Sequence, residues 1–192
     1  MAASRSIRAV LAAVLLTSIA APALAQTAPR AMPAPRDGSH DFDFLIGSWK
    51  AHLRKLVDPL TGSTKWIEFD GTSVTRKLLD TNSNLEDFHV AGPDGRRDGH
   101  TLRLYNVASG QWSIYLVDLK KGVLSPPPVV GTFSDGKGEF IDHEEFNGRM
   151  ILVRYQWTPQ GPDRAHMEQA FSIDNGKTWE ANWVLDLTRD GP

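Results

Sequence analysis

Hydrophobic and polar residues alternate along most of the chain from residue 44 onward. Successive side chains of an extended strand point to opposite faces, so this period of two predicts β-strands with one apolar face. Turn-forming residues recur roughly every 8–12 positions, as in all-β sandwiches and barrels. We therefore expect about ten strands, at roughly 47–57, 65–77, 84–90, 101–106, 111–118, 129–133, 138–146, 149–157, 164–172 and 178–188.

The breaks between these segments contain residues that favour tight turns. The dipeptides at 109–110, 147–148 and 175–176 each pair Ser or Asn with Gly and suit a hairpin. The three prolines at 126–128 lack the amide proton that a strand ladder needs, so they are expected at a sheet edge or in a crossing loop. No stretch has the pattern of a long amphipathic helix, although residues 40–47 suit one helical turn before the first strand.

The last three strands carry their largest side chains on one face. A series of hairpins with one apolar face has two free edges, and closing the sheet into a barrel removes them. About ten strands enclose an interior that side chains alone need not fill. The predicted fold is therefore an all-β, antiparallel, up-and-down barrel with a short N-terminal helical turn, and an open sandwich is the alternative. The apolar faces hold Ile151, Val153, Tyr155 and Trp157, then Met167, Gln169 and Phe171, then Trp179, Ala181, Trp183, Leu185 and Leu187.

The first 25 residues have the pattern of a secretory signal peptide. Arg5 and Arg8 precede an apolar stretch at 9–20, and a small-residue cleavage pattern ends at Ala25. The stretch is shorter than the roughly 20 apolar residues of a membrane span. We expect a periplasmic or secreted protein without an integral membrane span in the mature chain. Beyond the signal, the Ala- and Pro-rich residues 26–39 are predicted to be a flexible linker, and residues 40–190 form the barrel domain.

Composition excludes several classes of function. Removal of the signal leaves 167 residues with 19 basic and 23 acidic side chains, a formal charge of −4. A mildly acidic chain without a long basic cluster has no electrostatic footprint for nucleic acid. The absence of cysteine rules out a disulfide scaffold and thiol chemistry. The oligomeric state stays open.

Gly47-Ser48-Trp49 opens the first expected strand. This resembles the G-x-W start of lipocalins and other calycin barrels. In those barrels the Trp plugs one end and an Arg from a late strand lies across it, a part that the resemblance assigns to Arg189. Over about residues 40–190, with segments such as LRLYN, QWSIY, EQAFS and TWEANW, the chain is similar to a group of uncharacterised bacterial proteins with a lipocalin-like domain. The resemblance implies a calycin-type barrel and brings no established activity.

Residues 172–179, SIDNGKTW, resemble the Asp-box, a hairpin motif of the form S-x-D-x-G-x-T-W. The motif repeats on the propeller blades of sialidase-like glycosidases, but it occurs once here, in a chain too short for a propeller. We interpret it as a structural turn. Asp174 would accept backbone N–H groups, Gly176 would supply a positive φ, and Trp179 would pack beside the turn.

The histidines are the residues that could ligate haem or a metal ion. Nitrobindin-type haem barrels have glycines after the first Trp, whereas Lys50-Ala51-His52-Leu53 follow Trp49 here. His166 shares a strand face with Glu168 and not with the apolar set, so it is a weak candidate for haem or metal ligation. A zinc site needs three or four convergent ligands. We therefore predict no cofactor, haem included, and expect no metal site.

Three carboxylates are weak catalytic candidates, because opposed acids in a cavity suit general acid–base chemistry. They are Glu68, Glu86 and Glu168, and the favoured interpretation places each on a wet outer face. The chain has no nucleophile elbow, phosphate loop or H-E-x-x-H motif.

The aromatic residues indicate a binding protein more directly. We expect Trp157, Trp183 and Tyr115 to line a pocket for a flat or apolar molecule. Polar groups that could orient such a molecule are Arg103, Gln169 and Asn182. The predicted function is an exported protein that binds a small, partly apolar molecule in the barrel. The alternatives are an isomerase or hydrolase that uses the same cavity, and a structural or interaction module with a filled barrel.

Overall fold

The computed structural model of the protein describes residues 36–79 and 82–191. The chain divides into a unit Met1–Ala34, which lies outside the described residues, and a unit Pro35–Pro192, which contains the described strands. The predicted signal at 1–25 and most of the predicted linker at 26–39 therefore lie outside the described part. Among the described residues, no helix has the length and hydrophobicity to cross a bilayer.

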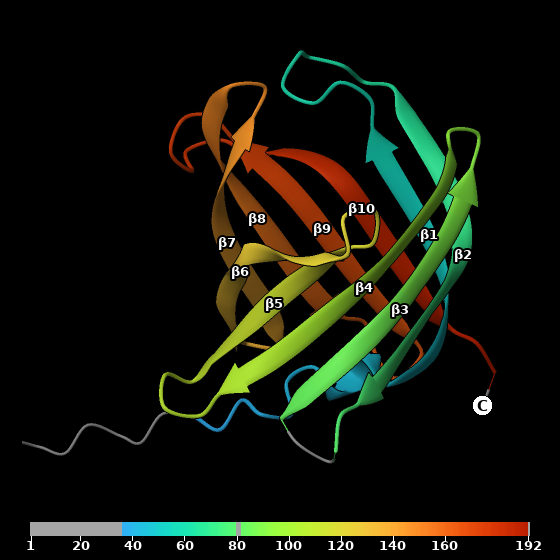
Figure 1. The fold of residues 1–192 in the computed structure, drawn as a ribbon, viewed down its shortest axis with the longest axis vertical. Coiled ribbons are helices and arrows are strands. Elements are labelled where there is room, and N and C mark those ends of the chain that lie inside the picture. The colour runs from blue at the N-terminus through green and yellow to red at the C-terminus, as the bar shows by residue number, and fades with distance from the viewer. Residues whose placement is uncertain (1–35, 80–81, 192) are drawn as a thin grey trace, which may run out of the picture. The chain divides into compact units, whose positions relative to one another are not determined.

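Ten antiparallel strands form one closed sheet (Figure 1). Each strand pairs with its neighbours along the chain, and the first strand pairs with the last, so the open sandwich is excluded. The predicted all-β, up-and-down barrel of about ten strands is confirmed. The strands are β1 (Gly47–Leu56), β2 (Trp66–Lys77), β3 (Ser83–Gly92), β4 (Gly95–Asn106), β5 (Gln111–Asp118), β6 (Val123–Ser134), β7 (Lys137–Phe146), β8 (Arg149–Pro159), β9 (Arg164–Ser172) and β10 (Glu180–Arg189).

Two strands are longer than the pattern of residues predicts. β4 begins at Gly95, because the polar stretch 96–100 pairs with β3 even though it lacks apolar alternation. β6 runs through the prolines at 126–128. The β5–β6 register shifts between Ile114 and Leu116, so the prolines form a bulge opposite Tyr115. The prolines lie at a local sheet edge, because β6 pairs with β7 only from Val130 onward. A sheet edge was one of the two placements predicted for them.

One side of the barrel wall is incomplete. β4 pairs with β5 only from His100 to Asn106, so residues 95–99 pair with β3 alone among the described strands. The next break lies between β6 and β7, whose pairing covers residues 130–134 of β6. Figure 1 shows the β5–β6 turn lying well below the β3–β4 turn, where β4 begins. We call this end of the barrel, which carries the β1–β2, β3–β4 and β5–β6 turns, the open end.

The opposite end of the barrel is closed by residues just before β1. The predicted helical turn is a short 3-10 helix, η1 (Asp43–Leu45). Leu45 is buried, and its carbonyl accepts a hydrogen bond of 2.8 Å from the Trp49 indole nitrogen. The Arg189 guanidinium lies 4.0 Å from the centre of the Trp49 ring, the arrangement that the calycin resemblance implies. Arg189 also donates hydrogen bonds to the carbonyls of Phe44, Ile46 and Pro162.

The core concentrates near this closed end. Phe42 is fully buried, and its ring lies within 4.9–6.1 Å of several other aromatic rings. Edge-to-face and stacked ring contacts both stabilise beyond the area they bury. The rings around Phe42 are those of Phe44, Trp112, Phe133, Phe140 and Trp157.

The residues just before the helical turn belong to the packed unit. The Gly38 amide donates to the Tyr105 hydroxyl at 2.8 Å, and the Gly38 carbonyl accepts from the Trp112 indole at 2.9 Å. Arg36 forms a salt bridge with Asp41. The end of the predicted linker, residues 36–39, is therefore held against the barrel, and the domain begins before residue 40.

The turn between β9 and β10 has the contacts expected from residues 172–179. Both Asp174 carboxylate oxygens accept hydrogen bonds from Thr178, at 2.9 Å from its amide and 2.6 Å from its hydroxyl. Gly176 has φ 83°, and its carbonyl accepts from the Trp179 indole. The segment forms a hairpin turn held by its own side chains.

Asp174 should make stability depend on pH. Hydrogen bonds from Thr178 lower the pKa of Asp174 from 3.8 to about 2. A lowered pKa contributes stability that is complete above the unfolded value of 3.8 and is lost as the pH falls toward 2. We expect Asp174→Asn to lower the urea midpoint at pH 5 and the difference from wild type to narrow between pH 4 and pH 2. Asp135→Asn, in the exposed β6–β7 turn, is the control, and an Asp174→Asn difference independent of pH would contradict this assignment.

Arg189 should stabilise the closed end strongly for a partly exposed side chain. Arg189→Met keeps the apolar stem but removes the guanidinium from Trp49 and from three carbonyls. Hydrogen bonds that involve a charged group are worth more than neutral ones, so the loss in free energy of unfolding should be about 3 kcal/mol. Urea denaturation measures it. Arg164→Met, at an exposed position on β9, is the comparison, and equal effects of the two substitutions would show that Arg189 does not seal the barrel.

Candidate functional site

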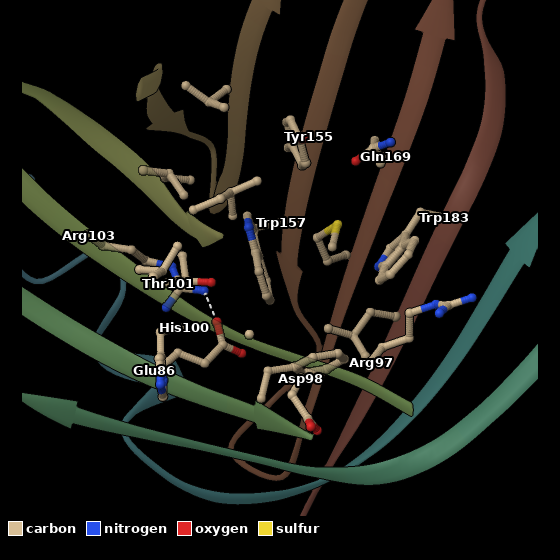
Figure 2. Close-up of a pocket in the computed structure, with 18 of the residues that line it drawn as sticks. Glu86, Arg97, Asp98, His100, Thr101, Arg103, Tyr155, Trp157, Gln169 and Trp183 are labelled. Atoms are coloured by element: carbon tan, nitrogen blue, oxygen red, sulfur yellow. Dashed lines mark hydrogen bonds and ion pairs between the residues drawn. The ribbon is translucent and has the colours of Figure 1, made fainter. Parts of the chain in front are cut away.

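A cavity of about 450 Å³ lies inside the barrel, between the aromatic core and the open end. Its volume is within the range of small-molecule sites. Figure 2 shows Trp157 and Trp183 projecting into it from neighbouring regions of the wall. Most of the wall is apolar, with Phe88, Ile114, Val129, Tyr155, Trp157, Met167, Trp183 and Leu185 among the lining residues.

A second hollow of about 670 Å³ lies closer to the β1–β2 turn. Gln169 and Trp183 line both hollows, so these two side chains stand between them. We call the first hollow the inner compartment and the second the outer compartment. The outer compartment is lined by Lys55, Leu56, Val57, Asp58, Pro59, Thr61, Ile67, Asp94, Phe146, Asn147, Phe171 and Asn182 in addition to the shared pair.

A buried ion pair lies in the wall of the inner compartment. Arg103 on β4 is 1 % exposed and Glu86 on β3 is 3 % exposed. One terminal nitrogen of Arg103 lies 2.5 Å from a Glu86 oxygen, and the other donates to Asn84 at 3.1 Å. The second Glu86 oxygen accepts from the Ser73 hydroxyl at 2.7 Å. Each charge is therefore compensated within the wall, which a buried ion requires.

Aromatic rings complete the surroundings of Arg103. Its guanidinium carbon lies 5.1 Å from the centre of the Phe42 ring and 5.4 Å from that of Trp157. The Arg103 Nε atom is buried and has no hydrogen-bond partner among the described residues. The guanidinium therefore links the aromatic core to the cavity.

The rim of the inner compartment is formed by residues 96–99 of β4, which pair with β3 but not with β5. Arg96, Arg97, Asp98 and Gly99 all line the compartment, although successive residues of a strand point to opposite sides. They can do so because this part of β4 has no partner on the β5 side. Lys120, at the tip of the β5–β6 hairpin, completes the rim.

The charges of this rim largely compensate one another. Arg97 forms an ion pair with Asp94, and Arg96 forms one with Asp98 at 3.2 Å. The Arg97 guanidinium also lies 5.1 Å from the Phe69 ring centre. The entrance is therefore polar without a strong net charge.

The structure brings most of the predicted ligand-binding residues together. Arg103, Trp157, Gln169 and Trp183 line the inner compartment, and Asn182 lines the outer one. Tyr115 does not line either hollow. It follows Ile114 on β5, whose side chain is in the core, and so points to the opposite face.

The three predicted carboxylates lie in different environments. Glu86 faces the inner compartment but is held by Arg103 and Ser73. Glu68 is exposed, and its neighbour Phe69 occupies the core face of β2. Glu168 lies 3.7 Å from Arg154 across the β8–β9 pair and does not line either hollow. The weak metal candidate His166 is also away from the hollows, 2.7 Å from Asp186.

An acidic group near the cavity was missed. The Tyr155 hydroxyl, in a residue that lines the inner compartment, lies 3.5 Å from Glu144. Burial raises the pKa of Glu144, and the charge of Asp142 raises it further. Burial, followed by the charge of Glu144, also raises the pKa of Tyr155. The sequence 142–145 reads as a solvated strand, but Glu144 shares parity with Phe140 and lies opposite the buried Ile151. The alternation along β7 could have identified Glu144 as an inward-facing residue.

Comparison with solved structures finds the S-type phycobiliprotein lyase from Guillardia theta. The two structures superpose with a TM-score of 0.56 at 13 % sequence identity, over 83 % of this chain and 96 % of the lyase. The protein has a lipocalin-like fold. At this identity the likeness concerns the fold alone. No family model matches the sequence, and no curated protein matches it either, so membership of the bacterial group and the Asp-box assignment stay predictions.

The buried ion pair should respond differently to single and paired substitutions. Arg103→Met leaves Glu86 buried without its counter-charge. Glu86→Gln likewise leaves Arg103 buried without its counter-charge. Either change should cost about 3–5 kcal/mol of unfolding free energy. The double substitution removes both charges and should restore much of that loss. Urea denaturation of the three variants gives the coupling, and strictly additive losses would mean that the two groups do not compensate each other.

Proposed function

We propose that this protein binds a small, partly apolar molecule inside its barrel, after export from the cytoplasm. The observation that carries the proposal is a hollow with apolar walls and a few fixed polar groups. Trp157, Trp183 and Met167 supply the apolar contacts, and Arg103 and Gln169 supply polar ones. Sites for small molecules commonly have this composition.

The hollow argues against the filled-barrel alternative. Aromatic packing is dense around Phe42 at the closed end, and the two compartments lie beyond Phe42. Protein interiors are normally packed as tightly as organic crystals, and an empty hollow loses stabilising contacts. A binding function explains why the chain retains the space.

The enzyme alternative has less support. Acid–base catalysis needs a group that can take or give a proton at the ligand. Of the three predicted carboxylates, Glu86 faces a hollow, and both of its oxygens are already engaged. The lyase of similar fold is named for action on phycobiliproteins, but 13 % identity transfers no active-site residue to this chain. Export rests on the signal pattern of residues 1–25.

Native mass spectrometry of the protein purified from its own source tests the proposal. We expect a chain that begins at Gln26, with a small molecule that denaturation releases. Thr101→Phe places a ring in the inner compartment, which Thr101 lines, and should lower affinity about tenfold. Thr132→Phe, at an exposed position on β6, should keep the affinity of the wild type.

Three results would each count against a part of the proposal. A wild-type protein that carries no small molecule would contradict the binding function. A molecule that is retained equally by both variants would lie outside the inner compartment. A chain that keeps residues 1–25 would contradict export with cleavage and leave the binding result to stand by itself.

A further inference from the structure

The strand β10 contains an irregularity beside the cavity. In the pairing with β9, Ala181 lies opposite Ala170 and Trp183 lies opposite Gln169, so Asn182 is an extra residue without a partner. Such a β-bulge changes the direction of the side chains around it and occurs often next to functional sites. Here Asn182 and Trp183 are consecutive, yet both line the outer compartment. The bulge therefore turns a polar amide toward the barrel interior.

Only one of the two polar atoms of the Asn182 side-chain amide has a hydrogen-bond partner among the described residues. The residue is 3 % exposed, and its side-chain oxygen accepts a hydrogen bond of 2.8 Å from the Gln169 amide nitrogen. The Asn182 Nδ2 atom is buried and has no partner among the described residues. A buried donor without an acceptor costs about 1–3 kcal/mol, and most buried polar groups in proteins are paired. In this arrangement Gln169 occupies the oxygen of the Asn182 amide, and the Nδ2 donor stays available.

The surroundings of the donor favour an uncharged acceptor. The apolar part of the outer compartment's wall includes Phe171, Ile67 and Trp183. Lys55 also lines the compartment, but Asp58 and Asp94 line it too, so no net positive charge is present. In the inner compartment, Arg103 is compensated by Glu86. A carboxylate or phosphate would meet no excess of positive charge in this compartment, whereas a carbonyl oxygen needs only a donor.

We propose that the bound molecule is uncharged and carries a carbonyl-type oxygen that accepts a hydrogen bond from Asn182 Nδ2. The apolar part of the molecule packs beside Trp183 and extends into the inner compartment. The Gln169–Asn182 pair orients its polar end. This assignment rests on the proposed binding function and adds the ligand class and a residue that determines specificity.

The test uses two fluorescent probes that differ in one group. The first is 6-propionyl-2-(dimethylamino)naphthalene, which carries a ketone, and the second is its 6-propyl analogue, in which a methylene replaces the carbonyl. Each probe is titrated against wild type, Asn182→Asp and Asn182→Ala. Gln156→Ala, on the outer face of β8, is the control. We expect both Asn182 substitutions to weaken binding of the ketone about tenfold and to change binding of the propyl analogue less than about twofold.

Emission of the bound ketone gives a second readout that needs no variant. A hydrogen bond to its carbonyl shifts the emission to longer wavelength, so the ketone bound to wild type should emit as it does in alcohols and not as in aprotic solvents of similar polarity. The propyl analogue should show no such effect. This readout remains decisive if the Asn182 variants fold poorly.

The possible failures are distinguishable. If both probes bind and the Asn182 substitutions weaken them equally, or if the bound ketone emits as in aprotic solvent, the carbonyl assignment is overturned and the binding function stands. If neither probe binds to the wild type, the proposed function is contradicted and the assignment falls with it.

Discussion

The pairing of the first strand with the last fixes the arrangement of the whole barrel. Residues Trp49 to Lys55 of β1 pair with Arg189 to Trp183 of β10. Trp49 and Arg189 are direct partners at one end of this ladder, where the guanidinium covers the indole. Lys55 and Trp183 are partners at the other end, where both line the outer compartment. A slip by one residue would turn each of these side chains to the opposite face. The same register therefore places the Trp49–Arg189 contact at the closed end and the Lys55–Trp183 pair in the wall of the outer compartment.

The interior changes character along the barrel axis. Near the closed end, Phe42 packs against four strands through aromatic contacts and leaves little space. Arg103 marks the transition, because its guanidinium lies near the rings of Phe42 and Trp157 while the residue also lines the inner compartment. Buried ion pairs are weak contributors to net stability compared with apolar packing. A charged pair at this boundary is better explained by the shape and polarity that it gives to the hollow.

The sequence alone supports the barrel because the alternation of apolar and polar residues recurs on most of the strands. Alternation in segments such as 149–157 places Val153, Tyr155 and Trp157 on one face, and the structure has that face inside. Parity also accounts for the failure at Tyr115, which follows the inward-facing Ile114. An outward tyrosine and an inward one differ only by their place in the alternation.

Other features depend on pairing between distant strands, which local patterns do not encode. The inward turn of Asn182 requires a bulge against β9, and the sequence around it reads as regular alternation. The full length of β4 was missed because Arg96 and Arg97 look like loop charges, although β3 holds them in a ladder. The buried position of Glu86 could not be assigned either, because polar and apolar residues mix on β3 and the counter-charge lies on another strand.

The three prolines of β6 have a consequence for the solubility of the molecule. The break between β6 and β7 exposes strand edges in the barrel wall. Exposed edges can recruit strands from other chains and start aggregation. Because residues 126–128 have no amide protons, this part of the β6 edge offers carbonyl acceptors without the donors that an incoming strand needs to form a ladder. The barrel can thus keep a gap in its side without becoming a template for fibrils.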